Sequence, residues 1–300
     1  LLIAADEHCP QPQTREHLSA LQIMGLRSLV VVQNKIDSVS KEGAINNYKE
    51  IKAFLATTPY KDAPVIPISA RYRTGIDALL AAIEEAIPTP ERDLTKDPIM
   101  LVARSFDINR PGTPPSKIVG GVIGGALIQG QLSVGDELEI RPGRKLEREG
   151  KVTWKPLTTK IVSMRTGELF LEKAGPGGTL GVMTLLDPSI VKSDQLVGSV
   201  AGRPGKLWPV WQSCALEVTL LERVAGLKEE LKVEPIKLGE PLMLNINSAT
   251  TVGVVAELGK NRIRCALKLP ICAAESSRIA LSRRIGTRFR LIGYGVLRGP

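Results

Sequence analysis

The stretch LVVVQNKID, residues 29–37, decides the fold class of the first third of the chain. Its first five residues form a short, uninterrupted, β-branched run, which is typical of a strand buried on both faces of a parallel sheet. The polar tetrapeptide NKID follows at once, and ligands in open α/β sheets bind beyond the carboxyl ends of the strands. The stretch therefore predicts a parallel sheet with a ligand site at this strand end.

Strands and helices alternate around this stretch. Apolar runs predict strands at residues 1–5 and 65–68. Helical patterns predict helices at 14–24, at 44–55 and at 74–87. Three strands that alternate with three helices imply right-handed crossovers and a parallel sheet. Because three strands are few for a doubly wound domain, we expect further strands before residue 1.

The ends of the predicted helices carry start and stop signals. Thr14 and Thr74 are the expected N-caps, and Gly25 is the expected end of the first helix. Asp77 stands three residues after Thr74, which is the spacing of a capping box. The faces that we expect to be buried are Ala44, Tyr48, Ile51 and Leu55 in the second helix and Ile76, Leu79, Leu80, Ile83 and Ile87 in the third.

From about residue 97 the chain changes to short β-type runs divided by Gly, Pro and Asp. That pattern is typical of all-β barrels or sandwiches. The stretch GRPGKLWP at 202–209 predicts a joint between two such domains. In the glycine-rich segment 120–130 the apolar residues lie between turn glycines, so we expect strands there rather than a linker. The predicted domains are residues 1–92, 93–206 and 207–300.

The composition excludes several classes of protein. The chain is 43% hydrophobic and 24% charged, which is ordinary for a folded globular protein. No apolar run approaches the roughly 18 residues of a membrane span. Four cysteines without a CxxC pair and only two histidines argue against a disulfide framework or a cysteine zinc site. We therefore predict neither a membrane partner nor a metal site, and we expect a loop role for the adjacent His8 and Cys9.

The formal net charge of +9 lies in the two later parts of the chain. Residues 1–92 are nearly neutral, whereas the two predicted β domains are both basic. Contact of these domains with a polyanion and a merely solvated basic surface are both open interpretations. The same two interpretations apply to the last domain's cluster of Arg283, Arg284, Arg288 and Arg290, which predicts either RNA contact or ordinary salt bridges.

The tetrapeptide Asn34-Lys35-Ile36-Asp37 has the residue types that recognise guanine. Asp37 can accept hydrogen bonds from N1–H and the exocyclic amine of guanine, whereas adenine would leave its carboxylate unpaired at a large cost. Asn34 can bridge the base and the neighbouring loop, and the Lys35 stem can lie over the purine face. Ile36 is expected to anchor the loop from below.

A second motif, Ser69-Ala70-Arg71, follows the next predicted strand. A small residue allows the backbone to approach closely, so the Ala70 N–H can donate to guanine O6. Ser69 would stabilise the turn, and Arg71 would cover the other face of the base. The NKxD pattern alone is weak, but two such motifs after two consecutive strands are far more specific. The competing interpretation is an Asn and an Asp that cap a surface turn.

The sequence does not contain the motifs that hold phosphates. Neither GxxxxGK[ST] nor DxxG occurs in the 300 residues. The chain thus has a base-recognition half without a phosphate cradle or a recognisable Mg²⁺ ligand. We expect both of them upstream of residue 1, and we predict no catalytic residue in this stretch.

These features resemble the gamma subunits of archaeal and eukaryotic translation initiation factor 2, a family related to elongation factor Tu. QTREH is shared with elongation factor Tu, whereas CPQPQ, GGVIGG and NSATTVG favour the initiation factor. The matching stretches are DEHCPQPQTREHL (6–18), NKID (34–37), PISA (67–70), GGVIGGALIQG (120–130), VGDELEIRPG (134–143), LDPS (186–189), LLERVAG (220–226), PLMLNINSATTVGVV (241–255) and SRRIGTRFRLIGYG (282–295).

The resemblance implies a multidomain α/β plus all-β fold, a partial P-loop-type GTPase domain followed by two β-barrels. By matching motifs, it implies that Asn34, Lys35, Asp37, Ser69 and Ala70 bind the guanine of GTP or GDP, with Mg²⁺ held upstream. It also implies a cytoplasmic heterotrimer rather than a homo-oligomer, with an alpha subunit on the second domain and a beta subunit on the GTPase domain. That complex delivers methionylated initiator tRNA to the small ribosomal subunit, and GTP hydrolysis drives release.

Three alternatives remain open on the sequence alone. A selenocysteine-specific elongation factor has the same three-domain plan but a different tRNA. A sulfate-activating GTPase has the same architecture and should not bind tRNA. For this stretch alone, a non-catalytic binding scaffold is the third alternative, because without a phosphate-binding loop it is expected to be inactive as a GTPase.

Overall fold

The computed structural model describes residues 1–221 and 231–299, so most of the stretch LLERVAG (220–226) lies outside the described residues. The chain groups into two compact units, one built mainly on Leu1–Pro90 and the other mainly on Glu91–Val218 and Ile236–Leu281. The three-domain division at residues 92 and 206 stays a prediction. No helix within the described residues is long and apolar enough to cross a membrane.

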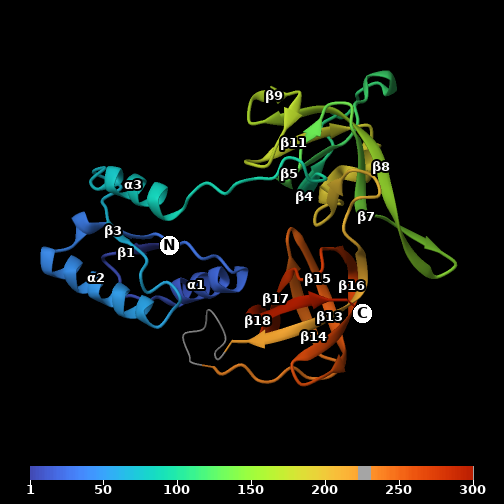
Figure 1. Ribbon diagram of the computed structural model, residues 1–300. Coiled ribbons are helices and arrows are strands. Elements are labelled where there is room, and N and C mark those ends of the chain that lie inside the picture. The colour runs from blue at the N-terminus through green and yellow to red at the C-terminus, as the bar shows by residue number, and fades with distance from the viewer. Residues whose placement is uncertain (222–230, 300) are drawn as a thin grey trace. The chain divides into compact units, whose positions relative to one another are not determined.

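The first unit contains a three-stranded parallel sheet, as predicted. Its order is β1 (Leu2–Ala4), β2 (Val31–Asn34) and β3 (Val65–Pro67) (Figure 1). Gln33 of β2 lies opposite Ile3 of β1 and also pairs with the last residue of β3. Because the strands are parallel, their carboxyl ends meet at one edge of the sheet.

Helix α1 (Pro12–Met24) follows β1 and starts two residues before the predicted N-cap. Gln11 is its N-cap, so the expected cap at Thr14 is wrong. Proline fits the first helical turn because its missing N–H needs no partner there. Gly25 ends the helix in the left-handed conformation, φ 72°, as predicted.

Helix α2 (Lys41–Ala56) begins after Ser40, whose hydroxyl accepts a hydrogen bond from the Gly43 N–H. Ile51 and Leu55 are fully buried, as predicted, but Tyr48 is 38% exposed. The third buried residue of the helix is Asn47. An apolar pattern cannot find such a residue, because its burial depends on hydrogen-bond partners from other segments.

The core of the first unit comes from β1 to β3, α1 and α2. Helix α3 (Ile76–Ala86) contributes no residue to it and has no buried residue at all. Leu80, Ile83 and Ile87 are 56%, 37% and 46% exposed, so the predicted buried stripe is wrong. The described residues place no element over this side of the helix, and periodicity alone cannot show whether a partner is there. The buried core residues are Ile3, Cys9, Leu18, Leu29, Val31, Ile51, Leu55, Tyr60, Ala63 and Val65.

The second unit contains a seven-stranded sheet whose order is β11-β5-β4-β12-β7-β8-β9. An additional β11–β8 pairing closes six of these strands into a ring, which confirms the predicted barrel. The strands are β4 (Ile99–Phe106), β5 (Val122–Gln129), β7 (Glu137–Arg148), β8 (Lys151–Thr166), β9 (Leu169–Leu171), β11 (Leu180–Thr184) and β12 (Val200–Gly202). Short elements around the ring are η2 (Pro115–Lys117), β6 (Leu132–Ser133), β10 (Lys173–Ala174), α4 (Pro188–Val191) and η3 (Lys192–Asp194).

A second closed barrel follows, again as predicted, with the strand order β13-β16-β15-β14-β17-β18. Leu216, Leu242 and Ile279 are among the residues fully buried in it. Its strands are β13 (Val210–Leu220), β14 (Pro241–Ile246), β15 (Ala249–Leu258), β16 (Arg262–Cys272), β17 (Arg278–Ile285) and β18 (Arg288–Arg298).

The glycine-rich segment is a strand, β5, as predicted, and one of its glycines is sterically required. A Cβ on Gly125 would lie 1.9 Å from the Leu101 carbonyl oxygen of β4. A Cβ on the adjacent Gly124 would meet nothing closer than Arg104 Cβ, at 3.6 Å. The close approach of β5 to β4 therefore requires glycine at position 125 but not at position 124.

We expect Gly125→Ala to lower the free energy of unfolding by about 2 kcal/mol or more, because backbone must move to admit the methyl group. Gly124→Ala in the same strand is the matched control and should cost clearly less stability, because its Cβ would meet nothing closer than 3.6 Å. Denaturant titration of both variants measures the difference. Equal effects at the two positions would contradict this account of β5.

An ion pair between buried Glu139 and half-buried Arg141 fixes the segment between the two barrels. The Glu139 carboxylate accepts hydrogen bonds from Arg141 Nε at 2.8 Å and from the Gly205 N–H at 2.7 Å. Arg141 also donates to the carbonyl oxygens of Leu207 and Trp208. Burial alone would raise the pKa of Glu139, but the hydrogen bonds from Arg141 and the Gly205 N–H outweigh it and hold the pKa below its ordinary value.

A lowered folded-state pKa means that ionised Glu139 stabilises the fold at neutral pH, and that this contribution is lost as the pH falls below 4.5 through the folded pKa. Glu139→Gln should therefore lower the free energy of unfolding by about 3 kcal/mol near neutrality, and by progressively less in acid. Denaturant titrations across this pH range measure the loss.

Glu147→Gln in the same strand is the control for that experiment. Its ion pair with Lys145 is exposed, so we expect a change close to zero. A loss for Glu139→Gln that did not shrink in acid would show that the charge of Glu139 is not what stabilises the joint.

Candidate functional site

The predicted NKID motif forms a tight turn at the carboxyl end of β2. Asn34 is the last residue of the strand, and Lys35 adopts the left-handed conformation with φ 64°. The short helix η1 (Ile36–Ser38) then holds Asp37. Ser38 closes the turn by donating from its hydroxyl to the Lys35 carbonyl oxygen at 2.7 Å. The turn presents Lys35 and Asp37 at the surface, with Ile36 half-buried between them.

The second motif forms a closed loop after β3. Ser69 and Thr74 exchange two backbone hydrogen bonds, which make an isolated antiparallel bridge. Thr74 is therefore part of this loop, and Gly75, φ 75°, is the N-cap of α3. The predicted N-cap at Thr74 and its capping box with Asp77 are wrong, because bridging to Ser69 takes Thr74 out of the cap position.

The two loops meet at the edge of the sheet. Ser69, which is 2% exposed, donates from its hydroxyl to Asp37 Oδ1 at 2.5 Å. The Ala70 N–H donates to Asn34 Oδ1 at 3.1 Å. The Ile36 N–H reaches the carbonyl oxygen of Ile68 at 3.3 Å. The structure thus brings together the residues of the two predicted motifs, 32 positions apart in the chain.

Asn34, Ser69 and Arg71 each have a definite partner. Asn34 ties the second loop, as the sequence predicts, but its partner there is the same Ala70 N–H that was predicted to donate to guanine O6. Ser69 stabilises the turn by accepting from the Tyr72 N–H at 3.2 Å. Arg71 lies with its guanidinium carbon 5.4 Å from the centre of the Tyr72 ring. The roles of all these residues toward a base stay predictions.

Sequence analysis missed one residue at this edge. Asp6 follows β1, and its carboxylate binds Lys35 Nζ with distances of 3.0 and 3.3 Å. This ion pair holds the Lys35 side chain across the ends of two neighbouring strands. The available signal was the position of Asp6 just after a predicted strand, at the same edge as the two motifs.

The adjacent His8 and Cys9 have a structural contact rather than metal-ligand geometry. Glu50 of α2 binds both, at 2.9 Å from His8 Nδ1 and 2.9 Å from the Cys9 N–H. The hydrogen bond from the Cys9 N–H, with the His8 ring, lowers the pKa of Glu50. Burial raises the pKa of the Cys9 thiol to about 11. The described residues contain no cluster of three or more His, Cys, Asp or Glu side chains that could hold a metal ion.

A cavity of about 590 Å³ adjoins the candidate site. Asn34 and Lys35 lie on its wall, together with the residues of β1, His8 and His17. This volume is within the range of small-molecule pockets. The first motif is therefore next to open space at Asn34 and Lys35.

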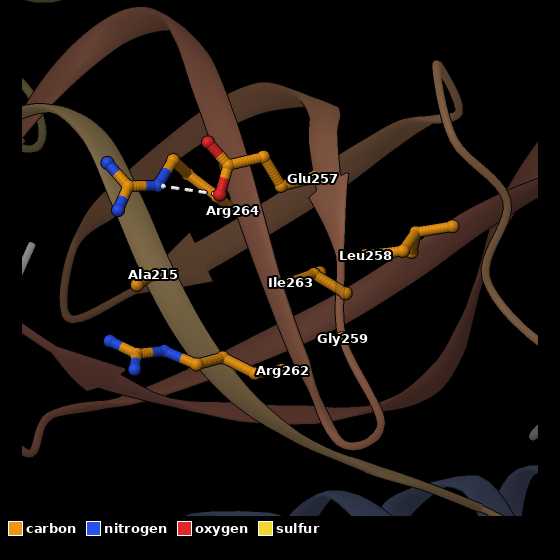
Figure 2. A pocket seen from close by; sticks show the side chains of 7 residues that line it. All are labelled: Ala215, Glu257, Leu258, Gly259, Arg262, Ile263 and Arg264. Carbon is orange, nitrogen blue, oxygen red and sulfur yellow. Dashed lines mark ion pairs between the residues drawn. The ribbon is translucent and has the colours of Figure 1, made fainter.

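Figure 2 shows a second hollow, of about 300 Å³, between β13, β15 and β16 of the second barrel. Its charged side chains already have partners within the chain. Arg264 Nε lies 3.4 Å from Glu257 Oε2 (Figure 2), and Arg262 donates to the Gly299 carbonyl oxygen. We assign no ligand to it.

The predicted arginine cluster near the C-terminus is partly used for structure. Arg283 donates through both terminal nitrogens, at 2.9 Å to the carbonyl oxygen of Glu234 and at 3.1 Å to that of Pro235. Arg284 donates to the Gly286 carbonyl oxygen at 3.3 Å. RNA contact by this cluster stays a prediction.

Comparison with known proteins assigns the family. Residues 1–89 match the elongation factor Tu GTP binding domain, and residues 212–297 match the C-terminal domain of initiation factor eIF2 gamma. Translation initiation factor 2 subunit gamma from Pyrococcus abyssi is 56% identical over 298 residues, which cover 99% of this chain and 72% of that protein. The chain belongs to the gamma subunits of translation initiation factor 2.

Other relatives agree with this assignment. The gamma subunits from Methanothermobacter thermautotrophicus and Methanocaldococcus jannaschii are 56% and 55% identical, and the chain covers 73% of each. The protein is therefore a translational GTPase of the initiation-factor type, a class that uses guanine nucleotide.

The fold is shared more widely than the sequence. Elongation factor SelB from Methanococcus maripaludis, in complex with the GTP analogue GppNHp, has a TM-score of 0.74 at 19% identity, over 99% of this chain and 64% of its own. A bacterial selenocysteine-specific elongation factor has a TM-score of 0.75 at 20% identity, and the chain covers 44% of it. At these identities the likeness shows the fold alone, so the initiation-factor interpretation holds over the selenocysteine-specific one.

Proposed function

We propose that residues 34–37 and 69–71 select guanine for a GTP-dependent carrier of initiator tRNA. The observation that carries the proposal is the meeting of the two motifs, with Asp37 bound by Ser69 and Asn34 bound by Ala70. A carboxylate has four lone-pair positions. With one taken by the Ser69 hydroxyl, Asp37 can still accept from N1–H and the exocyclic amine of guanine.

The other residues of the site support recognition of one flat base. Asp6 holds the Lys35 ammonium, which leaves the methylene stem of Lys35 as apolar surface for a purine face. Ser69 is buried and bonded on both sides, so it fixes the orientation of Asp37 before any ligand binds. Arg71 covers the other face of the base, and Ile36 anchors the loop from below.

The phosphates and Mg²⁺ need other groups. The residues around Asp37 fit the base end of GTP or GDP, and we assign none of them to the metal ion. In translational GTPases the phosphates and Mg²⁺ supply the switch: their contacts order loops in the GTP state and release them after hydrolysis. We therefore place base selection in this stretch and the hydrolysis step outside it.

The partners follow from the family. We propose that the protein forms a cytoplasmic heterotrimer with alpha and beta subunits, carries methionylated initiator tRNA in the GTP state, and releases it on the small ribosomal subunit. The support is the identity of 54–56% to gamma subunits over nearly the whole chain, together with the basic β domains, which suit a polyanionic partner.

Asp37→Asn should change base preference from guanine toward xanthine, because an amide can donate to the C2 oxygen of xanthine where the carboxylate accepted from guanine. In the full-length gene product we expect the ratio of XDP to GDP affinity to rise by about a hundredfold or more. Competition titrations with fluorescent GDP measure this ratio. Asp62→Asn, at an exposed acidic position, is the control, and an unchanged ratio for Asp37→Asn would refute the role of Asp37.

The carrier function predicts selective binding of one tRNA. With a non-hydrolysable GTP analogue, the full-length gene product should bind methionylated initiator tRNA at least about tenfold more tightly than methionylated elongator tRNA, and GDP should weaken the complex. Filter binding with deacylated initiator tRNA as control measures both differences. Equal affinity for the two charged tRNAs would refute an initiation carrier without touching the guanine assignment.

A further inference from the structure

Two buried carboxamides, Gln33 and Asn47, lie directly behind the candidate guanine site. Gln33 precedes Asn34 in β2 and is 1% exposed, and Asn47 of α2 is 5% exposed. Buried polar groups must find hydrogen-bond partners, because leaving them unpaired is costly. The Gln33 amide donates to the Ala44 carbonyl oxygen at 2.8 Å and to Asn47 Oδ1 at 2.9 Å. These bonds join β2 to α2.

Asn47 extends this connection to the loop after β1. Its own amide donates to the Glu7 carbonyl oxygen at 2.8 Å. Glu7 is the neighbour of Asp6, whose carboxylate binds Lys35 Nζ. Lys35 stands two residues after Gln33. The contacts therefore link Gln33 to Lys35 by a second route, which runs through Asn47 and the loop after β1.

The backbone of Gln33 also reaches the second motif. Its carbonyl oxygen accepts from the Ile68 N–H at 2.8 Å, and Ile68 directly precedes Ser69. Gln33 therefore contacts α2 through its side chain and the residue after β3 through its backbone, and Asn47 links it to the loop after β1.

We propose that the Gln33–Asn47 pair is the positioning element of the guanine site and acts through Asp6 on Lys35. The inference rests on the proposed function of residues 34–37. The Lys35–Asp6 ion pair is partly exposed, with 52% and 36% of the two side chains accessible. Such pairs contribute little free energy by themselves. The part-buried bond from the buried Asn47 side chain to Glu7 fixes the backbone beside Asp6, so the ion pair can place the Lys35 stem over the base.

Neither residue of the pair is catalytic, and neither lies at the surface that a base would touch. A purely structural role would also make them important for stability. The two roles differ in one respect: positioning requires that Asn47 and Asp6 act on nucleotide affinity through the same contact, so their effects on affinity should not add.

The test uses Asn47→Asp, which keeps the shape and the acceptor for Gln33 but removes the donor to Glu7. In the full-length gene product we expect GDP to bind about tenfold more weakly and to dissociate faster. Asn46→Asp is the matched control, because Asn46 is the exposed neighbour and the charge change is the same. Fluorescent GDP titration and dissociation rates are measured beside the thermal midpoint of each variant.

Asp6→Ala completes the cycle. It should weaken GDP binding in the wild-type background and add little in the Asn47→Asp background. Additive losses, or a lower thermal midpoint with unchanged GDP dissociation, would overturn the proposal. If Asn47→Asp does not fold, Asp6→Ala alone decides, since normal GDP binding by it would remove the route from the carboxamide pair to Lys35.

Failure of the inference differs from failure of the proposed function. If Asp37→Asn shifts base preference while Asn47→Asp behaves like Asn46→Asp, the guanine site stands and the positioning role falls. If Asp37→Asn has no effect on base preference, the guanine site itself is refuted.

Discussion

The parallel pairing of β2 with β3 is the constraint on which the candidate site depends. The backbone hydrogen bond from Ile68 to Gln33 brings the ends of the two strands level. Only then can Ser69 reach Asp37 and Ala70 reach Asn34. Both hydrogen bonds join residues that are far apart in the chain: Ser69 and Asp37 are separated by 32 positions, and Ala70 and Asn34 by 36. The register of the parallel strands therefore brings the two loops within hydrogen-bonding distance of each other.

The predictable part of the site is the part that follows strands. NKID and Ser69-Ala70 stand directly after apolar runs, so their meeting at one edge follows from parallel pairing. Asp6 also stands directly after an apolar run. Gln33 and Asn47 carry no such pattern. In α2 the apolar pattern predicted that Tyr48 is buried, but the buried residue is its neighbour Asn47. Gln33 is a polar residue at the end of an apolar run. Their burial depends on partners from three separate segments, which no local pattern contains.

The fold shows the same division. Short β runs between turn residues were enough to predict all-β barrels or sandwiches, because alternation and turns are local properties, and the family resemblance added that both are barrels. The caps at Thr14 and Thr74 and the buried face of α3 could not be predicted correctly. Pro12 moved the first helix start, the bridge to Ser69 removed Thr74 from the cap, and the apolar side of α3 lies exposed among the described residues. An amphipathic pattern shows which face of a helix can be buried, but it does not show whether another element covers that face.

A crystal structure of the full-length gene product with GDP tests the central claim most directly. The account predicts the guanine N1 and exocyclic amine within hydrogen-bonding distance of the Asp37 carboxylate, with the Lys35 stem against the purine face. A base bound elsewhere, with Asp37 still bonded to Ser69 and not to the ligand, would contradict it.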